Sequence, residues 1–303
     1  MTFGFERSLK LAFLYFTNPS DLGWTHQMNE GRLGLQGKYG AMVNASTYFE
    51  FVQEGEFEME QPSKGSTLRD KVDVPDMVSD GKGGQRLNTY APGFNILKKL
   101  CDEDFDLVFL TSFGYLSQGY DVSAYYEGCK KSVDNKQKDT LLVHISGYKT
   151  NPRYSTGFAK IYQMRYLTGI IAGSELKTRK LELEKSGKYD PFSPLCVGYV
   201  AAFPIPEVQR GINAFTIGCR KVFPDCVVRV LWSGTWHNEE LETNAASFLY
   251  NVGKCYIITQ HSDTLGPQKY YKQQNGKSIG YNTDSRRLIG DSVLQSAIFQ
   301  WTP

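Results

Sequence analysis

The sequence predicts an α/β protein of the doubly wound type, with parallel sheets that carry helices on both faces and with two lobes. The first observation is that short runs rich in β-branched and aromatic residues alternate with helical stretches along most of the chain. The second is that these runs are almost continuously apolar, which is typical of parallel strands covered on both faces. The third is the length of 303 residues, which favours two lobes over one.

The apolar runs have the length and composition of strands. We expect strands at residues 9–16, 105–113, 140–148, 195–203, 227–234, 254–262, 277–282 and 293–301. The β-branched and aromatic residues in these runs fit a pleated, buried surface.

Two of the intervening segments carry signals for the start of a helix. Pro206 suits the first helical position, and Glu207 beside it is favourable near the positive end of the helix dipole. Asn238 is expected to cap another helix, which has Glu239 and Glu240 in its first turn.

Residues 155–173, STGFAKIYQMRYLTGIIAG, predict a helix of another kind. It is apolar on most sides, so it belongs in a core and not on a surface. Gly169, Ala172 and Gly173 would allow a second backbone to approach closely. The segment lies midway along the chain, where we expect the first lobe to lead into the second.

Two polar stretches interrupt the alternation of strands and helices. Residues 53–91 are rich in Gly, Ser, Lys, Glu and Asp, and residues 177–194 read KTRKLELEKSGKYDPFSP. Neither stretch has the periodicity of an element, so we expect solvated insertions or long loops. For the second stretch, an extension of the preceding helix is the alternative.

Composition excludes several classes of function. The formal charge of +2 gives no electrostatic basis for binding nucleic acid or an anionic membrane. No run of eighteen apolar residues predicts a membrane span. The opening residues place their apolar run where a first strand should be, so we expect no signal peptide. The chain is then either intracellular or has lost a leader.

Six cysteines are scattered through the chain, without any CxxC pair. They are Cys101, Cys129, Cys196, Cys219, Cys226 and Cys255. In a chain of this length they do not indicate a zinc site or a disulfide scaffold, and buried or incidental thiols are the favoured interpretation. A disulfide between Cys219 and Cys226 is the alternative in an oxidising compartment.

The stretch VAAFPIPEVQRG, residues 200–211, points to the kind of ligand. In open α/β sheets, ligands bind beyond the carboxyl ends of strands. A phosphate would need glycine there, whereas this strand ends in Phe203, and Pro204 and Pro206 lack the amides that an anion would use. The chain also lacks GxGxxG and GxxxxGK[ST] motifs. This strand end is therefore expected to receive an uncharged ring.

Aromatic side chains recur at the other predicted strand ends, together with a few carboxylates, amides and hydroxyls. Such a set suits a flat, weakly polar ligand such as a purine. Trp24, Phe203 and Trp236 are the preferred candidates, because each follows a strand in a polar, turn-forming context. For any other single aromatic residue, packing in the core is the default interpretation.

These residues lie in segments that resemble the basic membrane lipoprotein (PnrA-like) family of ABC-transporter substrate-binding proteins. The segments are LKLAFLYFTNPSDLGWTHQMNEGR, TSFGY, GYKTNPRYSTGFAKIYQMRYLTGIIAG, VGYVAAFPIPEVQRGINAFTIG, TWHNEELETNAA, QHSD and IGYNTD, in the same order as in the family. The resemblance implies the periplasmic-binding-protein type I fold, in which two Rossmann-like lobes hold a ligand in the cleft between them. The lobes would be residues 1–150 with 286–303, and residues 151–285.

The resemblance also implies a ligand. Studied members of the family bind purine nucleosides, and the branch carrying AAFPIPEV is similar to one that binds a purine base. Asn282 falls where nucleoside binders place a ribose-binding aspartate, and Phe299 falls near a lysine position. Both departures favour a bare base such as adenine. The candidate ligand-binding residues are Asp21, Trp24, Thr25, Ser112, Phe113, Tyr148, Phe203, Trp236, Asp263, Asn282 and Asp284.

We expect a binding protein and not an enzyme, with no catalytic residue, metal site or cofactor. The sequence HSD at 261–263 contains three triad residue types, but adjacent residues of an extended strand point to opposite faces. The alternative function is a binding protein or sensor for a sugar or another polar solute. Expected partners are the small ligand and an ABC-transporter permease, and the family resemblance implies an extracytoplasmic location if a leader was removed.

Overall fold

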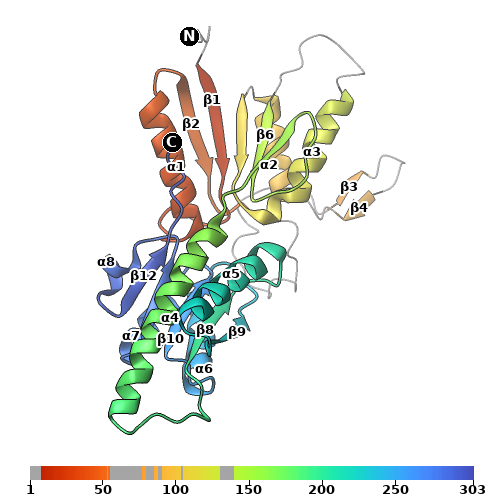
Figure 1. The fold of residues 1–303 in the computed structure, drawn as a ribbon. Helices are drawn as coiled ribbons and strands as arrows, with labels where there is room; N and C mark the ends of the chain where they lie inside the picture. The colour runs from red at the N-terminus through yellow and green to blue at the C-terminus, as the bar shows by residue number, and fades with distance from the viewer. Residues whose placement is uncertain are drawn as a thin grey trace. The chain divides into compact units, whose positions relative to one another are not determined.

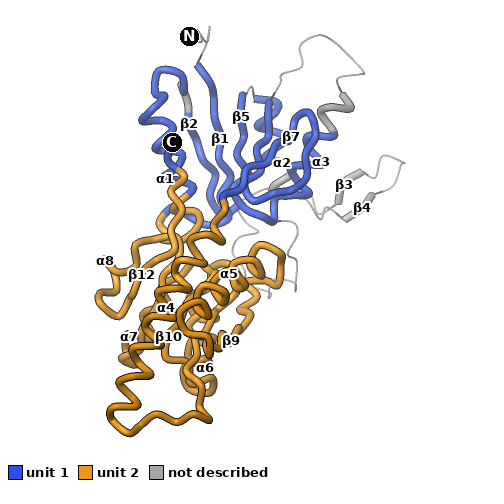
Figure 2. The backbone as a smooth tube through the Cα atoms, viewed as in Figure 1, with its two compact units in different colours: residues 1–19, 28–159, 302–303 blue, residues 20–27, 160–301 orange. Residues whose placement is uncertain are grey.

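The computed structural model describes residues 8–52, 54, 77–79, 85–87, 91–103, 105–129 and 140–303. The chain forms two compact units, coloured separately in Figure 2. Unit 1 comprises residues 1–19, 28–159 and 302–303, and unit 2 comprises residues 20–27 and 160–301. Most of the polar stretch 53–91 lies outside the described residues.

Unit 1 is built on a five-stranded parallel sheet with the strand order β2-β1-β5-β6-β7 (Figure 1). Its strands are β1 Leu9–Leu14, β2 Val43–Phe49, β5 Leu107–Leu110, β6 Leu141–Ile145 and β7 Tyr154–Gly157. Its helices are α1 Trp24–Tyr39, of which the first turn belongs to unit 2, α2 Ala91–Asp102, the short η2 Phe113–Tyr115 and α3 Leu116–Cys129. Two further short strands, β3 Met77–Ser79 and β4 Gln85–Leu87, pair antiparallel. Leu14, Val108 and Leu110 lie at the centre of the unit 1 core.

Unit 2 contains the second five-stranded parallel sheet, with the order β12-β11-β10-β8-β9. Its strands are β8 Cys196–Ala201, β9 Val227–Trp232, β10 Ile257–His261, β11 Lys277–Tyr281 and β12 Val293–Ala297. Its helices are α4 Ile161–Lys185, α5 Pro206–Val222, α6 Glu239–Asn251, α7 Gly266–Gln273 and α8 Ser285–Ile289. β8 and β10 are buried along their whole length, as expected of central strands with helices on both faces. The predicted fold class is confirmed.

Helices α4 and α5 pack directly against each other through their backbones, and Figure 1 shows them side by side. A Cβ atom at Gly169 of α4 would lie 2.1 Å from the Phe215 carbonyl oxygen of α5. A Cβ atom at Gly218 of α5 would lie 2.1 Å from the Tyr166 carbonyl oxygen of α4. The close approach expected of the small residues in α4 is therefore present, and α5 contributes a glycine of its own.

Four details differ from the sequence prediction. The segment predicted as a helix from residue 155 first forms β7, whose backbone pairs with β6, and α4 starts only at Ile161. The polar stretch 177–194 is not a loop throughout, because α4 continues to Lys185, and the alternative of an extended helix is confirmed that far. Residues 286–301 belong to unit 2, since β12 pairs with β11. Unit 1 extends past residue 150 to residue 159, because β7 completes its sheet.

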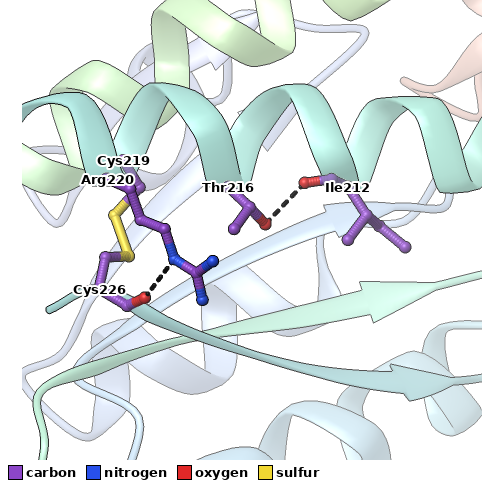
Figure 3. The surroundings of a disulfide bond; sticks show 5 residues. All are labelled: Ile212, Thr216, Cys219, Arg220 and Cys226. Carbon is purple, nitrogen blue, oxygen red and sulfur yellow. Dashed lines mark hydrogen bonds between the residues drawn. A yellow bond between two sulfur atoms is a disulfide. The ribbon is translucent and has the colours of Figure 1, made fainter. Parts of the chain in front are cut away.

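A disulfide joins Cys219, near the end of α5, to Cys226, just before β9 (Figure 3). The two cysteines are seven positions apart, and the Arg220 Nε atom also connects this segment by donating to the Cys226 carbonyl oxygen at 3.1 Å. One turn earlier, the Thr216 hydroxyl donates to the Ile212 carbonyl oxygen. The sequence left free thiols and a disulfide as alternatives for Cys219 and Cys226, and the structure contains the disulfide.

None of the helices in the described part of the chain combines the length and the apolar character that a membrane crossing requires.

Candidate functional site

Asp263 lies at the centre of the predicted site residues of unit 2. It follows β10 by two residues, where the carboxyl end of a central parallel strand places ligand-binding groups. Its Oδ1 atom accepts hydrogen bonds from the Trp24 backbone N–H and from the Asn282 Nδ2 atom, both at 3.0 Å. Its own N–H donates to the Trp236 carbonyl oxygen at 2.8 Å. One buried residue thus joins the loops that carry Trp24, Trp236 and Asn282, and we refer to these four residues as the Asp263 cluster.

The start of α1 is shaped by Asp21, which is buried in the loop after β1. Its carboxylate accepts from the backbone N–H groups of Gly23, Thr25 and His26 at 2.9, 3.3 and 2.9 Å. Side-chain acceptors of this kind satisfy the amides that a helix leaves unpaired at its first turn. Asp21 therefore fixes the turn that presents Trp24, and Thr25 is fully buried in that turn.

Gly23 permits the contact between this turn and Asp263. A Cβ atom at Gly23 would lie 2.3 Å from the Asp263 Cβ atom and 2.8 Å from its carbonyl oxygen. No larger residue fits without moving one of the two loops. Gly23 was not among the predicted residues, although a glycine directly before Trp24 in a turn is a signal for close backbone approach.

The two tryptophans of the Asp263 cluster each pack against further aromatic rings. The Trp24 ring packs edge-on against Trp301 at a centroid distance of 5.6 Å, and Trp301 in turn packs against Phe299 at 5.1 Å. The Phe203 ring packs edge-on against Trp236 at 5.3 Å. The indole N–H of Trp236 is buried and has no hydrogen-bond partner among the described residues. The candidate site thus combines aromatic rings in edge-to-face contact with one buried indole N–H that has no hydrogen-bond partner among the described residues.

Glu242 of α6 holds the loop that carries Asp263 through hydrogen bonds to the residues on both sides of Asp263. The Oε2 atom of Glu242 accepts from the Ser262 hydroxyl at 2.7 Å and from the Thr264 hydroxyl at 2.8 Å. Its Oε1 atom accepts from the N–H of Asn238, which caps α6 as predicted by accepting from the Leu241 N–H. Burial raises the pKa of Glu242 above its ordinary value, although these hydrogen bonds oppose the shift.

Burial also raises the pKa of Asp263 well above its ordinary value, and the nearby charges of Asp21 and Glu242 add to the shift. The hydrogen bonds from Asn282 and from the Trp24 N–H oppose it. Both of these bonds end on Oδ1, so Oδ2 is the oxygen that they do not use. When protonated, Asp263 can donate one hydrogen bond, and when ionised it can only accept.

A layer of buried polar side chains adjoins the cluster along β10 and β11. The His261 Nε2 atom lies 3.2 Å from the Tyr281 hydroxyl, and the Arg165 guanidinium carbon lies 3.9 Å above the Tyr281 ring. Burial lowers the pKa of His261, and the charge of Arg165 adds to the effect. The neighbouring Glu207 carboxylate, 3.7 Å from the His261 Nε2 atom, opposes this shift.

The tripeptide His261–Ser262–Asp263 does not form a catalytic chain in this structure. His261 contacts Tyr281, the Ser262 hydroxyl donates to Glu242, and Asp263 accepts from Trp24 and Asn282. Three separate sets of partners replace the serine–histidine–aspartate hydrogen bonds that nucleophilic catalysis requires. Among the described residues, no group of three or more His, Cys, Asp or Glu side chains is arranged to hold a metal ion.

Besides Asp21, Thr25 and Phe203, which are described above, four further predicted residues lie outside the Asp263 cluster. Asp284 is half-exposed and its carboxylate pairs with Arg287 at 2.9 Å. Ser112, Phe113 and Tyr148 belong to unit 1, where the Phe113 and Tyr148 rings are 6.4 Å apart. There the Ser112 carbonyl oxygen lies 2.7 Å from the His144 Nε2 atom, and Tyr148 is 70% exposed. Their part in a ligand site stays a prediction.

Some residues that support the cluster were not predicted. Glu242 lies four residues after the Asn238 cap, one position beyond the third residue of a capping box, so the sequence carried no capping signal for it. Phe299 was noted only as falling near a lysine position of the family, and its ring packs against Trp301, which in turn packs against Trp24. These contacts join segments far apart in sequence, which local patterns do not reveal.

The comparison with protein families agrees with the arrangement described above. The model of the Bmp family, PnrA-like substrate-binding proteins of ABC transporters, matches residues 9–302. The chain belongs to this family. The Bmp family is a substrate-binding, transport-associated type of protein and not a catalytic one, and the resemblance inferred from the sequence motifs is confirmed.

Two relatives align with nearly the full length of this chain. A purine-binding protein of Brucella abortus (strain 2308) is 28% identical over 98% of this chain and 67% of its own length. The TsgA13 protein of Haloferax volcanii, for which a role as an ABC-transporter glucose-binding protein has been proposed, is 26% identical over 97% of this chain. The chain spans 59% of the length of that second relative.

Solved structures share the fold of this Bmp chain. A solute-binding protein of an ABC transporter system from Aeropyrum pernix K1 superposes with a TM-score of 0.62 over 90% of this chain and 62% of its own. Its sequence identity is 13%, so the likeness concerns the fold alone. The predicted architecture of the periplasmic-binding-protein type is thereby confirmed.

Proposed function

We propose that this member of the Bmp family binds a purine base, with adenine preferred to a purine nucleoside. The observation that carries the proposal is the Asp263 cluster, where a buried carboxyl group with a raised pKa lies among the loops of Trp24 and Trp236. A purine offers a flat face for the aromatic rings and both donors and acceptors at its edge. The purine-binding relative from Brucella abortus supports the same ligand class.

The polar groups of the cluster support a base over a nucleoside. Asn282, at the position where nucleoside binders of the family are expected to place an aspartate, donates its amide N–H to Asp263 and so faces inward. One of its two amide N–H groups is therefore used within the protein, and an amide lacks the negative charge with which an aspartate would accept hydrogen bonds from ribose hydroxyls. Asp263 and the unused indole N–H of Trp236 would then read the edge of the base.

Calorimetry with adenine tests the proposal. Stacking on one aromatic ring contributes about 1–3 kcal/mol, so Trp24→Ala and Phe203→Ala should each weaken binding by about tenfold or more. Phe192→Ala is the matched control, since Phe192 is a 93% exposed phenylalanine of unit 2 outside the cluster, and its affinity should equal that of the unsubstituted protein. Unchanged affinity in both site variants would refute the pocket assignment.

A sugar is the second candidate ligand, because glucose has been proposed as the ligand of the Haloferax relative and tryptophan rings also stack on sugars. A thermal-shift screen with adenine, guanosine, inosine and hexoses separates the two classes. We expect adenine to raise the melting temperature most, since a ligand stabilises the folded state in proportion to the logarithm of its concentration over Kd. Stabilisation by hexoses alone would replace the purine proposal with the sugar one.

A further inference from the structure

Unit 2 contains a second pair of cysteines in close contact, besides the Cys219–Cys226 disulfide. The Sγ atoms of Cys196, the first residue of β8, and Cys255, two residues before β10, lie 3.0 Å apart. Both side chains are buried. Two sulfur atoms at this separation need to move by only about 1 Å to reach the 2.05 Å of a disulfide bond.

The backbone around this pair is already fixed in the native sheet. The Tyr256 N–H donates to the Cys196 carbonyl oxygen at 3.1 Å, and Ile257 pairs with Val197 in the parallel ladder of β10 and β8. The two cysteines are therefore held side by side by strands that are 59 residues apart in sequence. No change in strand register is needed to join them.

The polar surroundings favour reaction at Cys196. The exposed Arg229 side chain of β9 interacts with its Sγ atom, and a positive charge there favours the thiolate. The contact with the Cys255 thiol and then the Arg229 charge lower the pKa of Cys196, whereas the contact with Cys196 and burial raise the pKa of Cys255. Cys196 is thus the thiol of the pair that ionises first, and thiolates are the nucleophiles of disulfide exchange.

We propose that Cys196 and Cys255 are a second disulfide site, which cross-links the start of β8 to the segment that enters β10. The proposal concerns covalent structure and is independent of the ligand. An environment that maintains Cys219–Cys226 as a disulfide also supplies the oxidant for the second bond.

The reaction requires a disulfide oxidant such as oxidised glutathione. The Cys196 thiolate attacks one sulfur of the oxidant, the oxidant's S–S bond breaks, and one glutathione thiolate leaves and takes up a proton. The Cys255 thiol then loses its proton and attacks the Cys196 sulfur of the mixed disulfide, which releases the second glutathione. The two protein thiols have lost two electrons and two protons, and one oxidised glutathione has become two reduced ones.

Peptide mapping of the full chain tests the assignment. The protein is reduced, desalted, incubated with oxidised glutathione in the folded state, blocked with N-ethylmaleimide in denaturant and digested. We expect one cross-linked peptide that contains Cys196 and Cys255 and another that contains Cys219 and Cys226, with Cys101 alkylated. Recovery of Cys196 and Cys255 as alkylated thiols, as glutathione adducts or in bonds to other cysteines overturns the proposal.

Thermal unfolding adds a second measurement, in a background of Cys219→Ala and Cys226→Ala that removes the first disulfide. Oxidation of this variant should raise its melting temperature by roughly 4–16 °C, because the new bond closes a long loop in the unfolded chain. Adding Cys255→Ala should abolish the shift, whereas Cys101→Ala, a buried cysteine of unit 1, should retain it. If the background variant does not fold, the peptide map of the unsubstituted chain decides.

Discussion

At the scale of single residues, the contact between Gly23 and Asp263 leaves no room for a larger side chain. Gly23→Ala would place a methyl group within 2.3 Å of the Asp263 Cβ atom, so one loop must move and the hydrogen bond from Trp24 to Asp263 must lengthen. We expect at least a tenfold loss of adenine affinity by calorimetry and a lower melting temperature. The expected loss of stability is about 1–3 kcal/mol, the usual cost of overpacking a buried position.

Gly37→Ala is the matched control for this substitution. Gly37 lies in the same helix, α1, and a Cβ atom there has no neighbour within 4 Å. Alanine should stabilise the helix by about 0.5–1 kcal/mol and leave affinity unchanged. Equal binding by the Gly23→Ala and Gly37→Ala proteins would show that the contact does not support the site.

The raised pKa of Asp263 predicts how stability depends on pH. In the unfolded chain the pKa of Asp263 is near the ordinary value of 3.8, and in the folded protein it is higher. At a pH above 3.8 the folded state therefore binds more protons at Asp263 than the unfolded state does. The stability from the neutral carboxyl is therefore complete below that pH and is lost as pH rises through the folded pKa. An asparagine at this position cannot ionise, and it would keep an oxygen acceptor for the Trp24 N–H.

We therefore expect Asp263→Asn to melt at a higher temperature than the unsubstituted protein at pH 8, with the difference shrinking toward pH 5. Thermal unfolding at unit intervals of pH between these limits measures it. Asp291→Asn, on the surface beside Arg286, serves as the control and should follow the unsubstituted protein at every pH. A constant difference across the range for Asp263→Asn would contradict the assigned shift.

At the scale of elements, the pair α4 and α5 depends on the two glycines that let their backbones meet. Gly218→Ala puts a methyl group 2.1 Å from the Tyr166 carbonyl oxygen, and neither helix can yield without separating from the other. We expect a loss of about 1–3 kcal/mol in the free energy of unfolding, measured by urea denaturation. Ser174→Ala, at an exposed position of α4, should change it by less than about 0.5 kcal/mol.

Most elements of the sheets could be predicted because their sequences carry the signal themselves. The apolar runs of β8 and β10 are buried on both faces, and Pro206 and Asn238 mark the helix starts where the structure has them. The strands β2 and β7 were not predicted, because VNASTYF and YSTG contain polar residues and form strands by pairing with β1 and β6. Pairing partners of this kind lie far away in sequence, where periodicity gives no information.

The site was predictable in residue type but not in its hydrogen bonds. Trp24, Asp263 and Asn282 were expected from strand ends and from the family resemblance, and the structure brings them together. Asp284 was expected on the same grounds, yet it pairs with Arg287 because α8 starts directly after it. Which polar residue faces inward depends on local backbone geometry, and Asn282 adopts a left-handed conformation with φ of 61°.

At the scale of the whole molecule, each unit has a hydrophobic core of its own. Leu110 belongs to the core of unit 1 and Phe215 to a core of unit 2. We expect Leu110→Ala and Phe215→Ala to cost about 2–5 kcal/mol each. Hydrogen exchange should show faster opening of β1 and β5 in the first variant, and of β8 and β10 in the second. Faster exchange throughout both units in either variant would mean that they unfold as one.

The hydrogen bond from Trp24 to Asp263 joins residues 239 positions apart, and this has a consequence for synthesis. At about 5–20 residues per second, a ribosome makes Trp24 roughly 12–48 s before it makes Asp263. During that interval the Trp24 N–H lacks the Asp263 carboxylate that accepts its hydrogen bond in the folded protein. The first turn of α1 therefore cannot complete its native contacts until the loop after β10 has been translated.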